Sequence, residues 1–158
     1  MRFEDRLPID VPTTEHTTSR VLYLLLAVTT ALGAAHHIDH IIRGNHVGWP
    51  ITHHVNPFTY SLAIYPIVAL GLYLTLTDRA GDGYWAGVFT LSAFMLAYFH
   101  ISPWAVEPPQ DVILPYATPA VGYLAFVILL ALIAAASLSA VYAILLVYRK
   151  RKTQPTRP

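Results

Sequence analysis

The sequence has no cysteine in its 158 residues. This absence excludes disulfides, thiolate metal ligands and cysteine nucleophiles, so a bound metal would need imidazole, carboxylate or backbone oxygen. Charged residues are also scarce, at 12% of the chain against about a quarter in soluble domains. Glycine-rich phosphate loops and the Gly-x-Ser-x-Gly turn of hydrolases are missing. The sequence therefore gives no signal for nucleotide, flavin or nucleic-acid binding.

Apolar residues dominate what is present, at 55% of the chain. A soluble protein of this length cannot bury so much apolar surface, because small domains keep much of their surface in water. The composition therefore predicts an all-α integral membrane protein, whose main partner is the lipid bilayer.

Four long hydrophobic segments predict a bundle of four transmembrane helices in one domain, residues 20–148. A polar tail is expected at residues 1–19, and a basic tail at residues 149–158. The four helices are expected at about 20–43, 57–77, 84–102 and 118–148.

Prolines and one asparagine predict how these helices begin and bend. Asn56 is expected to cap the second helix and Pro57 to be its first residue. Pro66 predicts a kink, because it leaves the carbonyl of Leu62 without its donor. Between the third and fourth helices, residues 103–118 are rich in proline and predict a loop on the outer side.

The orientation of the chain follows from its basic residues. Residues 149–152 are all lysine or arginine, and such clusters stay on the cytoplasmic side. Four spans then place both termini inside, in the inner or plasma membrane. The two outer loops share a single basic residue, Arg43.

With this topology, histidines gather on the outer side of the membrane. His36 and His40 are one helical turn apart and project from one face, so they can share a metal ion. His53 and His54 immediately precede the second span, and His100 ends the third. These five histidines are the predicted metal ligands.

Neighbouring ionisable residues are expected to support the cluster. Asp39 lies within a membrane helix, where an unpaired carboxylate costs a few kcal/mol. Pairing with a histidine, with Arg43 one turn on, or with a metal would each offset that cost. His37, Asp39 and Arg43 are therefore expected to orient ligands or handle protons. Glu107 and Asp111 are on the same side, and their proline-rich loop favours interpreting them as solvated acids.

Two short patterns resemble known metal sites. The His-His-Ile-Asp-His string at residues 36–40 is loosely similar to the histidine boxes of membrane di-iron desaturases and hydroxylases, which carry several such boxes in longer chains. His36, His40 and His53 have the spacing of an Asp-His-His copper site in the membrane subunit of copper monooxygenases, with histidine replacing aspartate. Imidazole-rich ligation suits iron, copper or zinc. Haem is less favoured, because nothing marks a haem-sized pocket.

Several functions are compatible with this cluster. One is a metal site with redox or hydroxylase-like chemistry, although the sequence identifies no reaction or substrate. Alternatively, the chain is an accessory or scaffold subunit of a larger membrane complex, or a proton-responsive carrier or sensor. Small residues at four-residue spacing let helices approach closely and predict homo- or hetero-oligomer contacts. They are Ala27, Ala31 and Ala35 in the first helix and Ala131, Ala135 and Ser139 in the fourth.

Overall fold

The computed structural model of the chain describes residues 19–44 and 55–153, and it is helical without strands over these ranges. The predicted ligands His53 and His54, and nearly all of the predicted N-terminal tail, lie outside the described residues. The helices are α1 (Arg20–Arg43), α2 (Pro57–Ser61), α3 (Ile64–Leu76), α4 (Asp82–His100), α5 (Pro109–Ile113) and α6 (Pro119–Thr153).

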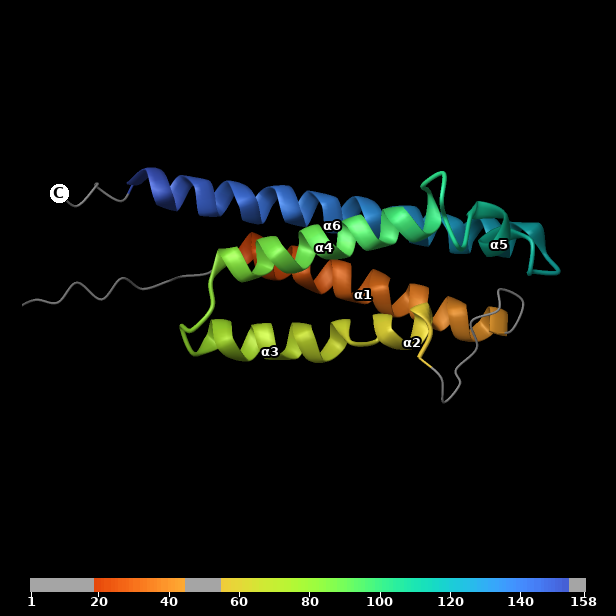
Figure 1. Cartoon of the computed structure of the whole chain (residues 1–158), viewed down its shortest axis with the longest axis horizontal. Helices are drawn as coiled ribbons and strands as arrows, with labels where there is room; N and C mark the ends of the chain where they lie inside the picture. Colours follow the sequence, from red (N-terminus) through yellow and green to blue (C-terminus); the bar gives the residue numbers. More distant parts are fainter. Residues whose placement is uncertain (1–18, 45–54, 154–158) are drawn as a thin grey trace, which may run out of the picture.

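The long helices run side by side along the long axis and alternate in direction (Figure 1). As a result, the start of α1 and the end of α6 lie at the same end of the molecule. A hydrogen bond of 2.8 Å between Ser19 Oγ and Tyr142 OH joins these two helices there.

Local sequence signals set the bounds of α1 and α2. The Ser19 side chain accepts from the backbone N–H of Val21 and caps α1, whose bounds match the prediction. Asn56 and Thr59 form a reciprocal capping box at the start of α2, with Pro57 at the first helical position. The predicted cap and first residue of this segment are therefore confirmed.

Pro66 also acts as predicted. It has no N–H to donate to the carbonyl of Leu62, and that carbonyl instead accepts from Tyr65 N at 3.2 Å in a tighter turn. The segment is interrupted at residues 62–63, between α2 and α3.

Helix α6 is the element against which α1, α4 and α5 pack. Small side chains make this close approach possible, because they let helix backbones come near each other. At Gly122, an added Cβ would lie 2.1 Å from the carbonyl oxygen of Ile113. Glycine at this position therefore lets α5 lie directly on α6. The buried small residues of α6 are Gly122, Ala125, Ala136, Ser139, Ala140 and Ala143.

The predicted oligomer contacts remain predictions. On α1, Ala27 and Ala31 are exposed and Ala35 is half-buried, whereas Ser139 of α6 is buried within the chain. Ala131 of α6 is also exposed and Ala135 half-buried, so both stripes keep small residues at the surface of the described chain. Helix α6 also continues past its predicted end at residue 148, so the first basic residues of the predicted tail belong to its last turn.

Three stretches within the described residues are long and apolar enough to cross a membrane: Arg20–Arg43, Pro57–Leu76 and Pro119–Thr153. These lengths and compositions indicate a membrane protein. Helix α4 has 19 residues and includes Asp82 and two glycines, and its composition alone does not mark it as a span.

Candidate metal centre

Four side chains from three separate elements converge near one end of the helices. His36 and His40 come from α1, His100 from the end of α4, and Glu107 from the loop that follows it. One nitrogen or oxygen of each lies within 4.8 Å of those of the others. All four residues are buried, and Glu107 is 0% exposed. Atoms at these separations can surround a single metal ion.

The helix geometry of α1 brings two imidazoles together. His36 and His40 are one turn apart, and their Nε2 atoms are 3.2 Å from each other. The His36 and His100 rings meet edge to face, with centroids 4.9 Å apart. The Nδ1 of His100 lies 3.2 Å from the carbonyl oxygen of Glu107, to which it can only donate. That bond leaves Nε2 of His100 with its lone pair, the usual arrangement of a metal-binding histidine.

Glu107 presents one carboxylate oxygen to the imidazoles. Its Oε2 lies 3.3 Å from His40 Nε2 and 3.2 Å from His100 Nδ1. Among the described residues this buried oxygen has no hydrogen bond of acceptable geometry. A buried acceptor without a donor is costly, and a cation placed between it and the Nε2 atoms of His36 and His40 would satisfy it.

Arg43 fixes Glu107 in this position. Its Nη1 donates to Glu107 Oε1 and to the backbone carbonyl of Asp111, the latter at 3.1 Å. Its Nε donates to Asp39 Oδ2 at 2.7 Å. Of the partners that the sequence suggested for Asp39, Arg43 is therefore the one that binds it in the structure. The hydroxyl of Tyr116 donates to the other oxygen of Asp39. The network holds Oε1 of Glu107 and leaves Oε2 directed at the imidazoles.

The electrostatics of this network favour an added cation. Within the described residues, two buried carboxylates, Asp39 and Glu107, share one guanidinium, that of Arg43. Burial raises the pKa of Glu107 to about 7, although Arg43 acts in the opposite direction. Burial and the bond to Asp39 raise the pKa of the Tyr116 hydroxyl to about 12. A divalent ion would supply the missing positive charge and favour the ionised form of Glu107.

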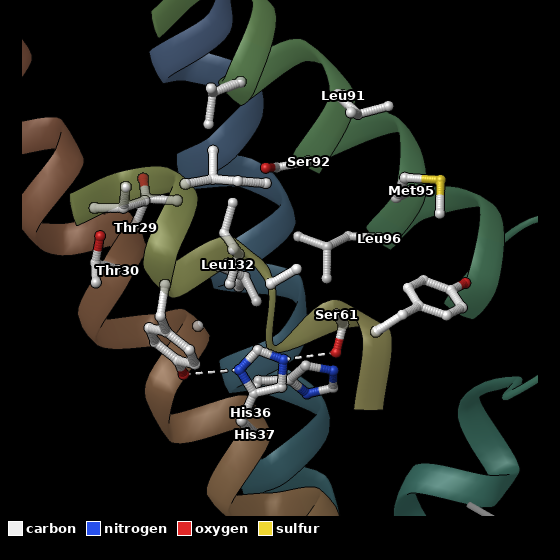
Figure 2. A pocket seen from close by; sticks show the side chains of 18 of the residues that line it. Thr29, Thr30, His36, His37, Ser61, Leu91, Ser92, Met95, Leu96 and Leu132 are labelled. Atoms are coloured by element: carbon white, nitrogen blue, oxygen red, sulfur yellow. Dashed lines mark hydrogen bonds between the residues drawn. The ribbon is translucent and has the colours of Figure 1, made fainter. Parts of the chain in front are cut away.

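His37 has a different role from its neighbours on α1. Its Nε2 lies 2.9 Å from Ser61 Oγ and its Nδ1 lies 2.8 Å from Tyr65 OH (Figure 2). The Ser61 hydroxyl already donates to the carbonyl of Phe58, so it accepts from Nε2–H, and Tyr65 donates to Nδ1. Both ring nitrogens are thus used to tie α1 to the α2–α3 segment.

The structure therefore brings together three of the five predicted ligands, His36, His40 and His100. The other two, His53 and His54, lie outside the described residues. Asp39 and Arg43 lie beside the group, as expected of supporting residues.

Interpreting Glu107 as a solvated acid was wrong, because this residue is fully buried at the centre of the group. The loop carrying it folds back when α5 packs on α6. Asp111 is partly buried, and its contact with Arg43 is made by its backbone. The signal in the sequence was Arg43, the single basic residue of the two loops predicted to be outside, where several acids were also expected.

A cavity of about 270 Å³ adjoins the histidines, between α1, the α2–α3 segment and α4. His36, His37, His40 and His100 line one end. Figure 2 shows side chains of α4, from Leu91 to Leu96, along another wall. The group is thus buried from water yet lies next to a space that a small molecule can occupy.

No protein-family model, curated protein or solved structure matches this chain. The fold and the site nevertheless define a class: a helical membrane protein with a buried histidine–glutamate group that could hold a metal.

Proposed function

We propose that this chain is a multi-pass membrane metalloprotein that binds a transition metal through His36, His40, His100 and Glu107. The observation that carries the proposal is the convergence of three imidazoles on a buried carboxylate oxygen that has no hydrogen bond among the described residues. Arg43 holds the other oxygen of that carboxylate, so the donor set is organised before an ion arrives.

Three imidazoles and one carboxylate suit zinc, iron or copper, whereas calcium and magnesium prefer oxygen ligands alone. The bonds from His100 Nδ1 to the Glu107 carbonyl and from Arg43 to Glu107 orient two of the proposed ligands, as partners of metal ligands commonly do. The adjoining cavity would give a bound metal access to a further molecule. Such access is what separates catalytic metal sites from closed structural ones, and it supports redox or hydroxylase-like chemistry.

We further propose four spans, with both termini in the cytoplasm and the metal centre near the outer face. Helix α4 supports this topology because it lies alongside α6 and alternates in direction with its neighbours (Figure 1). Its 19 residues extend about 28 Å, close to the thickness of a hydrocarbon core. Lys150, Arg151 and Lys152 end α6 at the face opposite the histidines, as expected for the cytoplasmic side.

Metal analysis of detergent-purified protein tests the proposal. The wild type should carry about one equivalent of iron, copper or zinc per chain, and the double variant His36→Ala/His40→Ala should carry almost none. His37→Gln is the matched control, since His37 lies on the same helix but uses both nitrogens within the protein. It should retain the metal.

Two outcomes would contradict the metal proposal. One is the absence of metal from the wild type after reconstitution with each of the three ions, which would favour the accessory-subunit or proton-sensor alternatives. The other is equal metal in the wild type and the double variant, which would place the metal elsewhere.

A further inference from the structure

The cavity beside the metal centre is elongated, with one chemically distinct end. Its wall on α4 extends from Val88 to His100, a rise of about 18 Å. Its volume is about 270 Å³. Carbon atoms pack about 4 Å apart, so a cavity of this length and volume suits an extended hydrocarbon chain.

The walls of the cavity are predominantly apolar and come from α1, α2, α3, α4 and α6. They include Leu26 of α1, Ile64 and Val68 of α3, Phe89 and Leu96 of α4, and Leu132 of α6. An apolar cavity of this kind favours hydrocarbon over water.

The rim of the cavity faces the surroundings of the protein between α3 and α4. Leu91 is 62% exposed and Ile67 is 40% exposed, and both line the cavity. Toward the turn that joins α3 and α4, the two helices are held together, because Tyr84 OH donates to the carbonyl of Ile67 at 2.7 Å. Exposed apolar residues on membrane helices contact lipid tails, so the rim opens toward the hydrocarbon region.

The histidine end favours a neutral oxygen group. A hydroxyl can exchange hydrogen bonds with imidazoles or approach a bound metal. A carboxylate would have to be moved from water into an apolar cavity, which costs more free energy than moving a neutral hydroxyl.

We propose that the cavity binds a single-chain lipid whose hydrocarbon tail lies along α4 and whose neutral terminal oxygen lies at the histidine end. This inference names the class of ligand that binds beside the proposed metal centre. It rests on the proposed function only for the contact between the terminal oxygen and the metal; the binding of the tail does not depend on it. Entry is lateral, from the bilayer, between Ile67 and Leu91.

Photolabelling of the protein in phosphatidylcholine vesicles tests the site of the tail. The probe is a medium-chain alcohol with a photoreactive diazirine in its hydrocarbon chain, and labelled residues are mapped by mass spectrometry. Label should concentrate on the cavity-facing residues of α3 and α4. Ser92→Phe fills the cavity two helical turns from His100, and it should reduce that label about tenfold, the effect of losing contact with roughly two methylene groups.

Thr90→Phe is the matched control, because Thr90 is exposed on the same helix and does not line the cavity. It should leave labelling unchanged. Gly33→Leu fills the cavity from α1, where an added Cβ would lie 3.9 Å from Leu132. It should also reduce labelling, so it provides a second test of the site if Ser92→Phe does not fold. Label spread evenly over the exposed apolar surface, and insensitive to both filling variants, would overturn the proposal.

Competition separates the polar end from the tail. Unlabelled alcohol should displace the probe about tenfold more effectively than the alkane of equal length, a difference that one hydrogen bond can supply. Equal displacement would overturn the assignment of the oxygen to the histidine end. Labelling of the metal-free His36→Ala/His40→Ala variant measures binding of the hydrocarbon tail in the absence of metal. Wild-type protein that is labelled in the cavity but carries no metal after reconstitution means that only the metal proposal fails. Wild-type protein that carries metal but is labelled evenly means that only the lipid proposal fails.

Discussion

The two ends of the helix array bury different kinds of side chain: apolar ones at one end and ionisable ones at the other. Near the start of α1, the core consists of Leu22, Leu26, Trp85, Phe89, Ala140 and Ala143, packed without a charge among them. Near the end of α1, the buried residues are His36, Asp39, His40, Arg43, His100 and Glu107. Packing at the first end stabilises the fold, whereas burial of ionisable groups at the second costs free energy unless every charge is compensated.

Each end also has an ion pair, and the two pairs differ in solvation. Arg43 and Glu107 are both 0% exposed in their side chains. Lys150 reaches Asp82 at 2.6 Å, and here the lysine side chain is 47% exposed although that of Asp82 is 3% exposed. The first pair cannot be replaced by water, whereas at the second water reaches the lysine. This contrast is consistent with the proposed metal centre at the polar end and with a stabilising role for the apolar end.

Arg43→Met should give the largest effect, because it harms both stability and the site. It leaves the buried carboxylates of Asp39 and Glu107 without their cation, and breaking such a buried pair costs about 3–5 kcal/mol. Unfolding of the metal-free protein in detergent, followed by circular dichroism, measures the loss. Metal content should also fall, because Glu107 is no longer oriented.

Arg79 is exposed in the turn between α3 and α4, so Arg79→Met is the matched control. It should change the free energy of unfolding by less than about 0.5 kcal/mol. An Arg43→Met variant as stable as this control would show that the polar end is not an interdependent network.

Trp85→Ala should destabilise the protein without touching the site. Trp85 is 1% exposed in the apolar core, and its Nε1 donates to Thr75 Oγ1 at 3.0 Å. Loss of a buried aromatic costs about 3–5 kcal/mol, but folded protein should bind the same amount of metal. Trp104→Ala, at a position 72% exposed, is the control and should change stability little. Loss of metal from folded Trp85→Ala protein would show that the two ends are coupled.

The sequence predicted the parts of this structure that local chemistry decides. The bounds of α1, the cap at Asn56 and the interruption caused by Pro66 all follow from residues near each other in the chain. The convergence of His36, His40 and His100 followed from helix periodicity and an assumed topology. In the first three cases a short segment contained the whole cause, whereas the meeting of His36 and His40 with His100 also required the arrangement of α1 and α4.

The sequence did not predict the burial of Glu107, because its cause lies in tertiary packing. Gly122 lets α5 approach α6, and this contact folds the loop back over the histidines. No periodicity in residues 103–118 indicates that return. Likewise, the separate role of His37 depends on Ser61 and Tyr65, which reach it from the α2–α3 segment.

Lys150→Met should give the smallest effect and tests the comparison of the two ion pairs. The lysine side chain is 47% exposed and the Asp82 side chain 3%. Water can therefore partly replace the ammonium group beside Asp82, and the loss should be about 1–2 kcal/mol, below that of Arg43→Met. The measurement is the same unfolding experiment, at low and high salt, with the wild type alongside. The wild-type advantage over Lys150→Met should shrink at high salt, whereas its advantage over Arg43→Met should persist, since that pair is shielded from ions. A Lys150→Met loss as large as that of Arg43→Met would mean that both ends depend on buried charge, and the apolar end could not then be regarded as the stabilising half.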